Sequence, residues 1–578
     1  MKRLIAMLLA LLMLSGCGAK SETPAAPSET AAPEAPVQTA PENKEVAFES
    51  RFKSETLIEL SDEGIKTKAL SVFASNDIVY YEDRDTYESG NPYGEGTDAD
   101  KHTAEEAAAH IVVNITEAGR YRVTGKLSAG QIRVDLGDNA YEDENAVVEL
   151  ILDNADITCT VAPAILFLNT YECDGQWSEE TAKAEVDTAK AGANLILEGE
   201  NQVSGSYVAR IYKDKEGEKK LWKQDGAIYS YMSMNVYGPG VLNLNAENEG
   251  MDTELHLTIN GGKVNIRSGN DGINTNEDNV SVTTINGGTV CITAGLGVEG
   301  DGIDSNGYLV INGGSVISSA HPAADAGLDS DKGSFINGGT VIALGSTMDW
   351  AESESNQVTM NLQFASYQAE NAAIEVKHED GTAIFSFDPA SDPVLGELDR
   401  KYMGAIISCP GFKQGENYLV YTGGTQMQYS GTDVQRFPGG VGGFPGGRGE
   451  MPEGFNGQRP EGFDGQIPAD MDLPEGFGKI PSREDPEMGK GFGGQRPEGG
   501  ERPEGFDGER PEGFEGFNGR FPEGFEGQLP EGFDGQMPEG FEGRFPGGMG
   551  GGQQSGESST LFYMQDKVNS FSGVSAVA

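Results

Sequence analysis

A short motif occurs four times between residues 259 and 342: Ile259-Asn260-Gly261-Gly262, Ile285-Asn286-Gly287-Gly288, Ile311-Asn312-Gly313-Gly314 and Ile336-Asn337-Gly338-Gly339. Its asparagines are spaced by 26, 26 and 25 residues. Asn and Gly both tolerate positive φ, so each Asn-Gly-Gly predicts a corner between two strands. The residues after each corner alternate between apolar and polar, which predicts strands with one buried face.

A second, acidic motif lies between these corners, at residues 249–254, 271–276, 301–306 and 326–331. Each period therefore contains three short strands and three corners, and stacked units of this kind form a right-handed parallel β-helix. Helices are disfavoured because Gly and β-branched residues interrupt every candidate run. We predict an all-β fold: a right-handed parallel β-helix (solenoid) with a C-terminal β cap and a long disordered Pro/Gly-rich insertion.

Changes in composition divide the chain into seven segments. These are a lipoprotein signal peptide with its lipobox (1–17), a disordered spacer (18–50), an N-terminal lead-in (51–104), the parallel β-helix domain (105–345), a β cap (346–435), disordered Pro-Glu-Gly-Phe repeats (436–552) and a C-terminal strand segment (553–578). The last segment returns to strand composition, and we expect it to rejoin the cap. A lysine-rich stretch at residues 209–223 is read as a loop inserted into one coil.

The overall charge limits the classes of partner. The 578 residues include 92 acids and 41 bases, a formal net charge of −51. This balance argues against nucleic-acid binding, because nothing offsets phosphate repulsion, and it is compatible with divalent cations. Pro-Glu-Gly-Phe occurs eight times in residues 436–552, where Pro and Gly block both helix and sheet. We interpret these repeats as a passive surface spacer, with weak Phe-mediated partner binding as the alternative.

The N-terminus predicts export. A basic start precedes an apolar run, Leu4 to Leu14, that is too short to span a bilayer. The following Leu-Ser-Gly-Cys resembles a bacterial lipobox, in which Cys17 becomes lipidated. We expect the protein to be a monomer on the extracellular face of the bacterial cell membrane, with the N-terminal lipid as its membrane contact.

The extracellular setting also permits disulfides. Cys159 and Cys173 are the closest pair of the remaining cysteines, and four separately buried thiols are the alternative.

The acidic motifs are the candidate functional site. If Ile273 and its equivalents point inward, the alternate Asp and Asn residues point outward and form rows about 4.8 Å apart along the stack. Two carboxylates at that separation repel by about 1 kcal/mol even in water, so a bridging cation is favoured. Calcium prefers such oxygen ligands. We expect calcium as the cofactor, with these ligands: Asp271, Asn274, Asp301, Asp304, Asn306, Asp329 and Asp331. The alternative is a solvated acidic face with Asn side chains bonded along the stack.

Three segments carry a resemblance to a known family: Ile115 to Tyr121, Asp225 to Ser230 and Gly300 to Gly307. Over about residues 105–430, the chain resembles the secreted β-helical carbohydrate-binding family of clostridial-type bacteria, which is distantly related to pectate lyases. The resemblance implies a right-handed parallel β-helix with bound calcium that attaches to plant cell-wall polysaccharide. Ala326 stands where the motif elsewhere has an acid, which puts the metal site of that coil in doubt.

We therefore expect a polysaccharide-binding protein rather than an enzyme, with polygalacturonate or cellulose as the ligand. Trp350, Tyr308 and Trp222 are the aromatic candidates for stacking on sugar rings. One alternative is a calcium-dependent, pectate-type lyase, in which Arg267 or Lys332 would be the base, although no distinctive motif fixes one. A surface adhesin that binds through the Pro-Glu-Gly-Phe repeats is the other alternative.

Overall fold

The structure is a computed structural model that describes residues 46–81, 100–175, 178–211, 222–391, 395–398, 400–432, 434 and 558–577. Outside the described residues lie residues 1–45, which include Cys17, all of the Pro-Glu-Gly-Phe repeats (436–552) and the side chain of Trp222. The regular structure is nearly all β, as expected, with one short helix, α1 (Ala104–Ala108), and three 3₁₀ turns, η1 (Ala140–Glu142), η2 (Pro389–Ser391) and η3 (Leu395–Glu397). None of the described helices is long and apolar enough to cross a membrane.

A nine-stranded sheet contains the acidic motifs. In spatial order its strands are β25 (Leu328–Ser330), β22 (Ile303–Ser305), β19 (Ile273–Thr275), β16 (Glu249–Thr253), β13 (Gly226–Ser230), β8 (Ile165–Asn169), β6 (Gly130–Asp135), β4 (Ile111–Ile115) and β3 (Val72–Ser75). All neighbours are parallel except β3 and β4, which are antiparallel. The antiparallel β3 therefore ends the parallel series at one edge.

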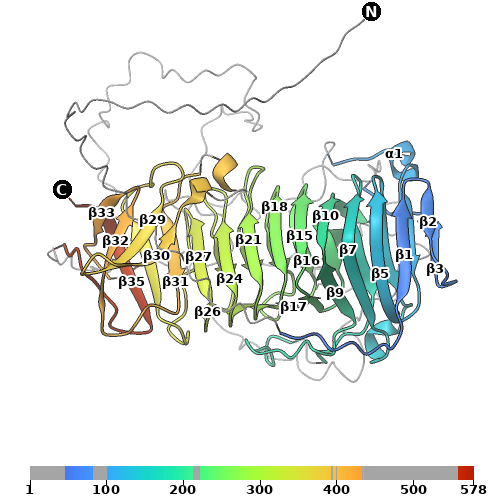
Figure 1. Ribbon diagram of the computed structural model, residues 1–578, viewed down its shortest axis with the longest axis horizontal. Helices are drawn as coiled ribbons and strands as arrows, with labels where there is room; N and C mark the ends of the chain where they lie inside the picture. The colour runs from blue at the N-terminus through green and yellow to red at the C-terminus, as the bar shows by residue number, and fades with distance from the viewer. Residues whose placement is uncertain are drawn as a thin grey trace, which may run out of the picture. The chain divides into compact units, whose positions relative to one another are not determined.

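A larger sheet contains two further parallel ladders, one on each side of the Asn-Gly-Gly corners. One ladder runs through β5 (Gly119–Leu127), β7 (Val148–Thr158), β9 (Ala193–Glu198), β14 (Met234–Tyr237), β17 (Leu257–Ile259), β20 (Val282–Ile285), β23 (Tyr308–Ile311) and β26 (Ser334–Ile336). The other links β7 to β10 (Glu200–Gly205), β15 (Val241–Ala246), β18 (Lys263–Ser268), β21 (Thr289–Thr293), β24 (Ser315–Ser319) and β27 (Thr340–Gly345). Figure 1 shows many of these strands side by side.

The register confirms the spacing read from the sequence. Val264 pairs with Val290, Val290 with Val316, and Val316 with Val341, so each strand pairs with the equivalent strand one repeat later. The second glycine of each corner has positive φ, between 80° and 88° at Gly262, Gly288, Gly314 and Gly339. A Cβ on Gly288 would lie 2.6 Å from the carbonyl oxygen of Gly262, so the stacked corners leave no space for a side chain.

The corner asparagines form a hydrogen-bonded row along the stack, which we call the asparagine ladder. Asn286 Nδ2 donates to Asn260 Oδ1 at 2.9 Å, Asn312 Nδ2 to Asn286 Oδ1 at 2.9 Å, and Asn337 Nδ2 to Asn312 Oδ1 at 3.0 Å. Each interior amide both donates and accepts. The row therefore links its own amides, and at its end Asn337 Oδ1 also accepts from the backbone N–H of Asn356 at 3.1 Å and from Asn356 Nδ2 at 2.9 Å.

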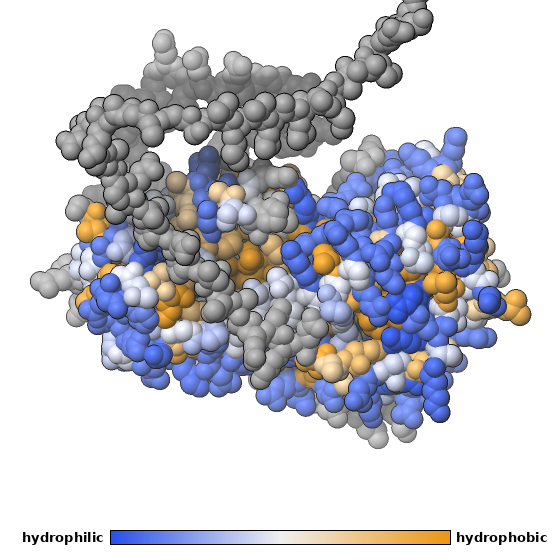
Figure 2. Space-filling model, viewed as in Figure 1, coloured by the Kyte–Doolittle hydropathy of each residue, from blue (hydrophilic) through white to orange (hydrophobic). Residues whose placement is uncertain are grey.

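The core lies between the ladders. Met251, Ile273, Ile303 and Leu328 are fully buried, as are Thr253, Thr275 and Ser305, which confirms the inward set expected from the alternation. On the face shown in Figure 2, hydrophilic residues dominate over the N-terminal strands, with scattered apolar ones among them. Residues that point into the core alternate along each strand with residues that point away from it, and this alternation is the reason for the period-two pattern.

The N-terminal strands β1 (Thr56–Ser61) and β2 (Gly64–Lys66) form an antiparallel pair, and β1 also pairs in parallel with β5. After β27 the pairing becomes mainly antiparallel, through β28 (Thr359–Phe364), β29 (Ile374–His378), β30 (Ala383–Phe387), β31 (Gly404–Ser408), β32 (Asn417–Thr422) and β33 (Thr425–Gln428). The C-terminal strands β34 (Phe562–Tyr563) and β35 (Val568–Ala576) pair with β32 and with β28 and β33. The C-terminal segment thus rejoins the strands that follow the repeats.

Candidate metal centre

Five strands of the nine-stranded sheet, β13, β16, β19, β22 and β25, position the acidic side chains. Parallel pairing places Asp252, Asn274, Asp304 and Asp329 in one row, each beside its equivalent in the next repeat. The residues on either side of each of them in the chain point into the core, so this row faces away from it. The register alone therefore brings carboxylates from separate repeats together.

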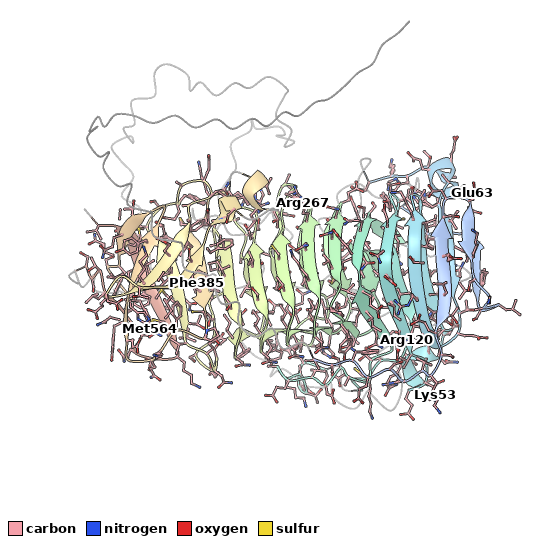
Figure 3. All side chains as sticks on the ribbon, viewed as in Figure 1. Lys53, Glu63, Arg120, Arg267, Phe385 and Met564 are labelled. Atoms are coloured by element: carbon pink, nitrogen blue, oxygen red, sulfur yellow. The ribbon has the colours of Figure 1, made fainter. Side chains whose placement is uncertain are left out.

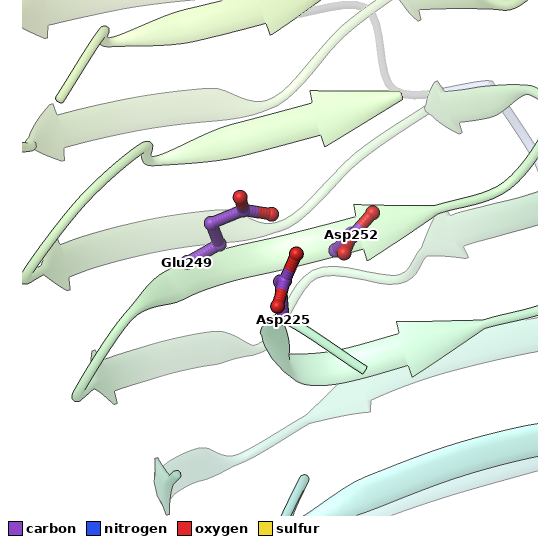
Figure 4. A group of neighbouring side chains, drawn as sticks. All are labelled: Asp225, Glu249 and Asp252. Atoms are coloured by element: carbon purple, nitrogen blue, oxygen red, sulfur yellow. The ribbon is translucent and has the colours of Figure 1, made fainter. Parts of the chain in front are cut away.

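Three carboxylates near the middle of this sheet form a compact cluster, which we call the carboxylate cluster: Asp225, Glu249 and Asp252. One oxygen of each lies within 4.8 Å of one oxygen of the others. Glu249 and Asp252 both project from β16, and the carboxylate of Asp225, which precedes β13, lies between them (Figure 4). Their relative exposures are 6%, 3% and 0% in chain order, so the alternative of a solvated acidic face does not hold here.

Several oxygens around the cluster have no hydrogen-bond partner. Glu249 Oε2, Asp252 Oδ2 and Asn274 Oδ1 are buried without one in the described part of the chain. The opposite oxygens are satisfied, because Asn276 Nδ2 donates to Asp252 Oδ1 at 2.7 Å and Asn274 Nδ2 approaches Glu249 Oε1 at 3.4 Å. A buried acceptor left unpaired costs about 1–3 kcal/mol, and more if it is charged. The donor set is carboxylate and amide oxygen, which fits a hard divalent cation such as calcium.

The electrostatics show what such a cation would relieve. Burial, and then the charge of Asp225, raises the pKa of Glu249 to about 7. Burial, with Glu249 as the next cause, raises the pKa of Asp252 well above its ordinary value. Further along the row, burial and then Asp329 raise the pKa of Asp304 to about 8. Each shift reports a charged form that the fold by itself disfavours.

One lysine lies against the cluster. Lys223 belongs to β12 (Trp222–Gln224), which pairs only with β11 (Val208–Ile211) in an antiparallel hairpin inside the lysine-rich stretch. Its ammonium forms an ion pair with Asp225 Oδ2. The Asp225 carboxylate is the main cause of a raised pKa at Lys223, and Glu249 raises it further, whereas burial lowers it. The positive charge of the ammonium is therefore held beside the cluster.

The structure gives the predicted ligands different surroundings. Asn274 is the one that adjoins the carboxylate cluster. Asp271 Oδ1 accepts from the Asp301 backbone N–H at 2.6 Å, and Asp301 Oδ1 accepts from that of Ala326 at 2.5 Å. These two carboxylates therefore bind the backbone of the next repeat, which explains how Ala326 can replace an acid where the row ends.

The other predicted ligands lie along the same sheet. Asn306 Nδ2 donates to the Asn276 carbonyl at 3.0 Å, and Asp329 Oδ1 accepts from the Ser330 N–H at 3.1 Å. Burial is the main cause of raised pKa values at Asp329 and Asp331. Within the described residues, the carboxylate cluster is the one group of three acids close enough to share an ion.

Sequence reasoning did not select Asp225, Glu249 and Asp252 as ligands. It ranked acids by how many occur in neighbouring repeats, which favoured Asp301, Asp304, Asp329 and Asp331. The number of acids in neighbouring repeats does not reveal which of them are buried, and burial is what makes unpaired oxygens costly. The available signal was Lys223, a base next to an acidic motif in a strongly acidic chain.

The candidate sugar-binding aromatics are not equivalent. Trp350 is 3% exposed and packs in the core, so its ring offers no open face for stacking. Tyr308 is half-buried, and its ring centroid lies 6.3 Å from that of Phe335.

Of the candidate bases, Lys332 Nζ pairs with Glu179 at 3.1 Å, and Arg267 lies at the end of β18 in the other sheet (Figure 3). Neither residue adjoins the carboxylate cluster in the manner of Lys223. Cys159 and Cys173 remain separate thiols.

Comparison with known proteins adds a family likeness. The model of a family described as "carbohydrate-binding domain-containing protein" matches residues 110–394, a range that includes the carboxylate cluster. A curated protein of the same description from Acetivibrio thermocellus is 29% identical over 157 residues, which are 27% of this chain and 45% of that protein. The match thus spans less than half of the relative's length. A solved structure of the polysaccharide lyase-like protein from C. thermocellum (gadolinium derivative) is 20% identical, has a TM-score of 0.28, and is aligned over 50% of this chain and 93% of its own. Residues 110–394 are therefore similar to a carbohydrate-binding-domain family.

Proposed function

We propose that this protein binds polysaccharide at the bacterial cell surface and that calcium in the carboxylate cluster supports the binding. The likeness of residues 110–394 to a carbohydrate-binding-domain family supports the ligand class. The buried, unpartnered oxygens of Glu249, Asp252 and Asn274 support the cation, and this is the observation that carries the proposal.

The metal ligands in this proposal are Asp225, Glu249, Asp252 and Asn274. If each of these side chains gives one oxygen, the four oxygens are fewer than the six to eight that calcium takes, so positions remain for water or for a ligand carboxylate. Calcium bound there would offset the charge that otherwise repels an anionic polymer from a chain of net charge −51. Polygalacturonate is therefore the first ligand to test and cellulose, which carries no charge, is the second.

The architecture in this proposal is a right-handed parallel β-helix, supported by the three parallel ladders and by the 26-residue offset that separates Val264, Val290 and Val316. Its successive strands would present side chains at regular intervals to an extended polymer. We also propose that Cys17 is lipidated and holds the protein at the outer face of the membrane, on the basis of the Leu-Ser-Gly-Cys sequence.

The test is sedimentation of the protein with insoluble polygalacturonate or cellulose, in calcium and in chelator. We expect calcium-dependent binding to polygalacturonate that the Glu249→Gln variant loses. The matched control is Glu375→Gln in β29, which removes an acid from the cap and should bind like the wild type. Undiminished binding of the wild type in chelator, or undiminished binding of Glu249→Gln in calcium, would contradict the calcium part of the proposal. No binding to any polysaccharide would contradict the ligand class.

The same samples distinguish binding from lyase activity. β-Elimination creates an unsaturated product that absorbs ultraviolet light, so a steady rise in absorbance with polygalacturonate and calcium would replace the binding proposal with catalysis. We expect no rise, because the two candidate bases do not adjoin the cluster.

A further inference from the structure

We propose that Lys223 is an internal counter-ion that lowers the affinity of the carboxylate cluster for cations and restricts it to divalent ones. This inference rests on the proposed cation site and concerns its regulation. It begins from the position of the ammonium group, which is paired with Asp225 Oδ2 and belongs to a hairpin outside both long sheets.

The charges around the cluster are unequal in number. With a cation bound and the carboxyl groups ionised, Asp225, Glu249 and Asp252 bring three negative charges, and Lys223, whose ordinary pKa is near 10.5, brings one positive charge. The remainder is two negative charges, which one divalent cation neutralises. A trivalent cation would leave an excess positive charge in a buried site, which is unfavourable.

The oxygens around the cluster fall into two groups, one paired with the lysine and one open to a cation. Lys223 takes an oxygen of Asp225, while the unpartnered oxygens belong to Glu249, Asp252 and Asn274. The lysine therefore leaves a place for a cation among these three side chains and repels that cation from the side of Asp225. Two like charges within a few ångströms at a protein surface repel strongly, so the lysine should weaken cation binding by at least about tenfold.

The exposure of the pair supports an adjustable counter-ion. The side chain of Lys223 is 52% exposed, whereas the side chain of its partner Asp225 is 8% exposed. The long stem of the lysine can move into solvent, and the acids cannot. The lysine thus stabilises the cation-free cluster, and its flexible stem lets the ammonium adjust its position beside Asp225 when a cation binds.

The test is calcium and terbium titration of the wild type and of the Lys223→Met variant, which keeps the apolar stem and removes the charge. We expect the variant to bind calcium at least about tenfold more tightly and terbium with a still larger gain. Lys126→Met is the matched control. Lys126 lies on β5, in the other sheet, its side chain is 59% exposed, and its ammonium pairs with Asp156 at 2.6 Å. Both variants change the net charge by the same amount, so the control should bind as the wild type does.

Thermal unfolding gives a readout that a merely structural lysine would not produce. We expect Lys223→Met to unfold at a lower temperature than the wild type in chelator and to show a larger stabilisation by calcium. Equal or weaker calcium affinity in the variant, or the same gain in the Lys126→Met control, would overturn the inference while leaving the cation site in place. If the wild type binds neither ion, the cation site itself fails, and the two failures are therefore distinguishable.

Discussion

The asparagine ladder and the carboxylate cluster are built by the same repeats and have opposite needs. Both place polar side chains from successive repeats in contact through parallel register. In the ladder each amide donates to one neighbour and accepts from the next, so the row is complete. In the cluster, carboxylates only accept, and one oxygen each of Glu249 and Asp252 remains unpartnered within the described part of the chain. A repeated fold therefore gives a structural row or a binding site depending on whether its side chains carry donors.

The strongest test of this contrast is Asp252→Asn, which gives the cluster an amide like those of the ladder. The amide oxygen can still accept from Asn276, and the like charge beside Glu249 disappears. In chelator we expect the variant to be more stable than the wild type by about 1–3 kcal/mol, and we expect calcium affinity to fall at least about 100-fold. Calorimetric titration and thermal unfolding measure the two effects.

The control for this variant is Asp331→Asn, at the far end of the same sheet. It should keep both the calcium affinity and the stability of the wild type. Loss of calcium binding in Asp331→Asn but not in Asp252→Asn would move the site to the acids that the sequence analysis ranked first.

The pH dependence of stability should also separate the two rows. The pKa of Glu249 is raised from 4.5 to about 7 in the folded chain, so folding favours its protonated form. Its contribution to the free energy of unfolding is present below the unfolded pKa and is lost as the pH rises through about 7, for a total of up to about 3 kcal/mol. In chelator the melting temperature should therefore fall between about pH 5 and pH 8, and calcium should restore it most at the higher pH. A melting temperature that rises over this range in chelator would contradict the assigned burial of these acids.

A smaller effect is expected when the ladder is given an acid. In Asn312→Asp the carboxylate still accepts from Asn337 but no longer donates to Asn286, so one exposed hydrogen bond is lost. We expect a loss of about 1 kcal/mol that is the same in calcium and in chelator, measured by denaturant unfolding. A calcium-dependent difference would show that the ladder, too, binds cations.

A change that should leave polysaccharide binding intact is the replacement of residues 435–557 with a short Gly/Ser linker. Tyr429 and Ser559 exchange two backbone hydrogen bonds of 2.9 Å, so the chain on either side of this segment is already joined. Loop-closure entropy changes slowly with length, and we expect stability to change by no more than about 2 kcal/mol while polysaccharide binding is kept. Loss of binding in sedimentation would favour the adhesin alternative.

The sequence predicted the strands and their register well because spacing and alternation are local, repeated signals. The interval from Asn260 to Asn286 became the pairing of Val264 with Val290, and Ile273 was correctly placed inward. The site was predicted less well. The row was foreseen, but whether Asp252 is exposed or buried depends on what packs over it, and the sequence does not encode that locally. Trp350 illustrates the same limit, because its ring is enclosed by the fold.

The central claim is tested most directly by an experimental structure of the full chain grown in calcium, with anomalous scattering used to locate the ion. The account predicts an ion bound by oxygens of Asp225, Glu249, Asp252 and Asn274, with the Lys223 ammonium still beside Asp225. An empty cluster at saturating calcium, with its carboxyl groups hydrogen-bonded to one another as shared-proton pairs, would contradict it.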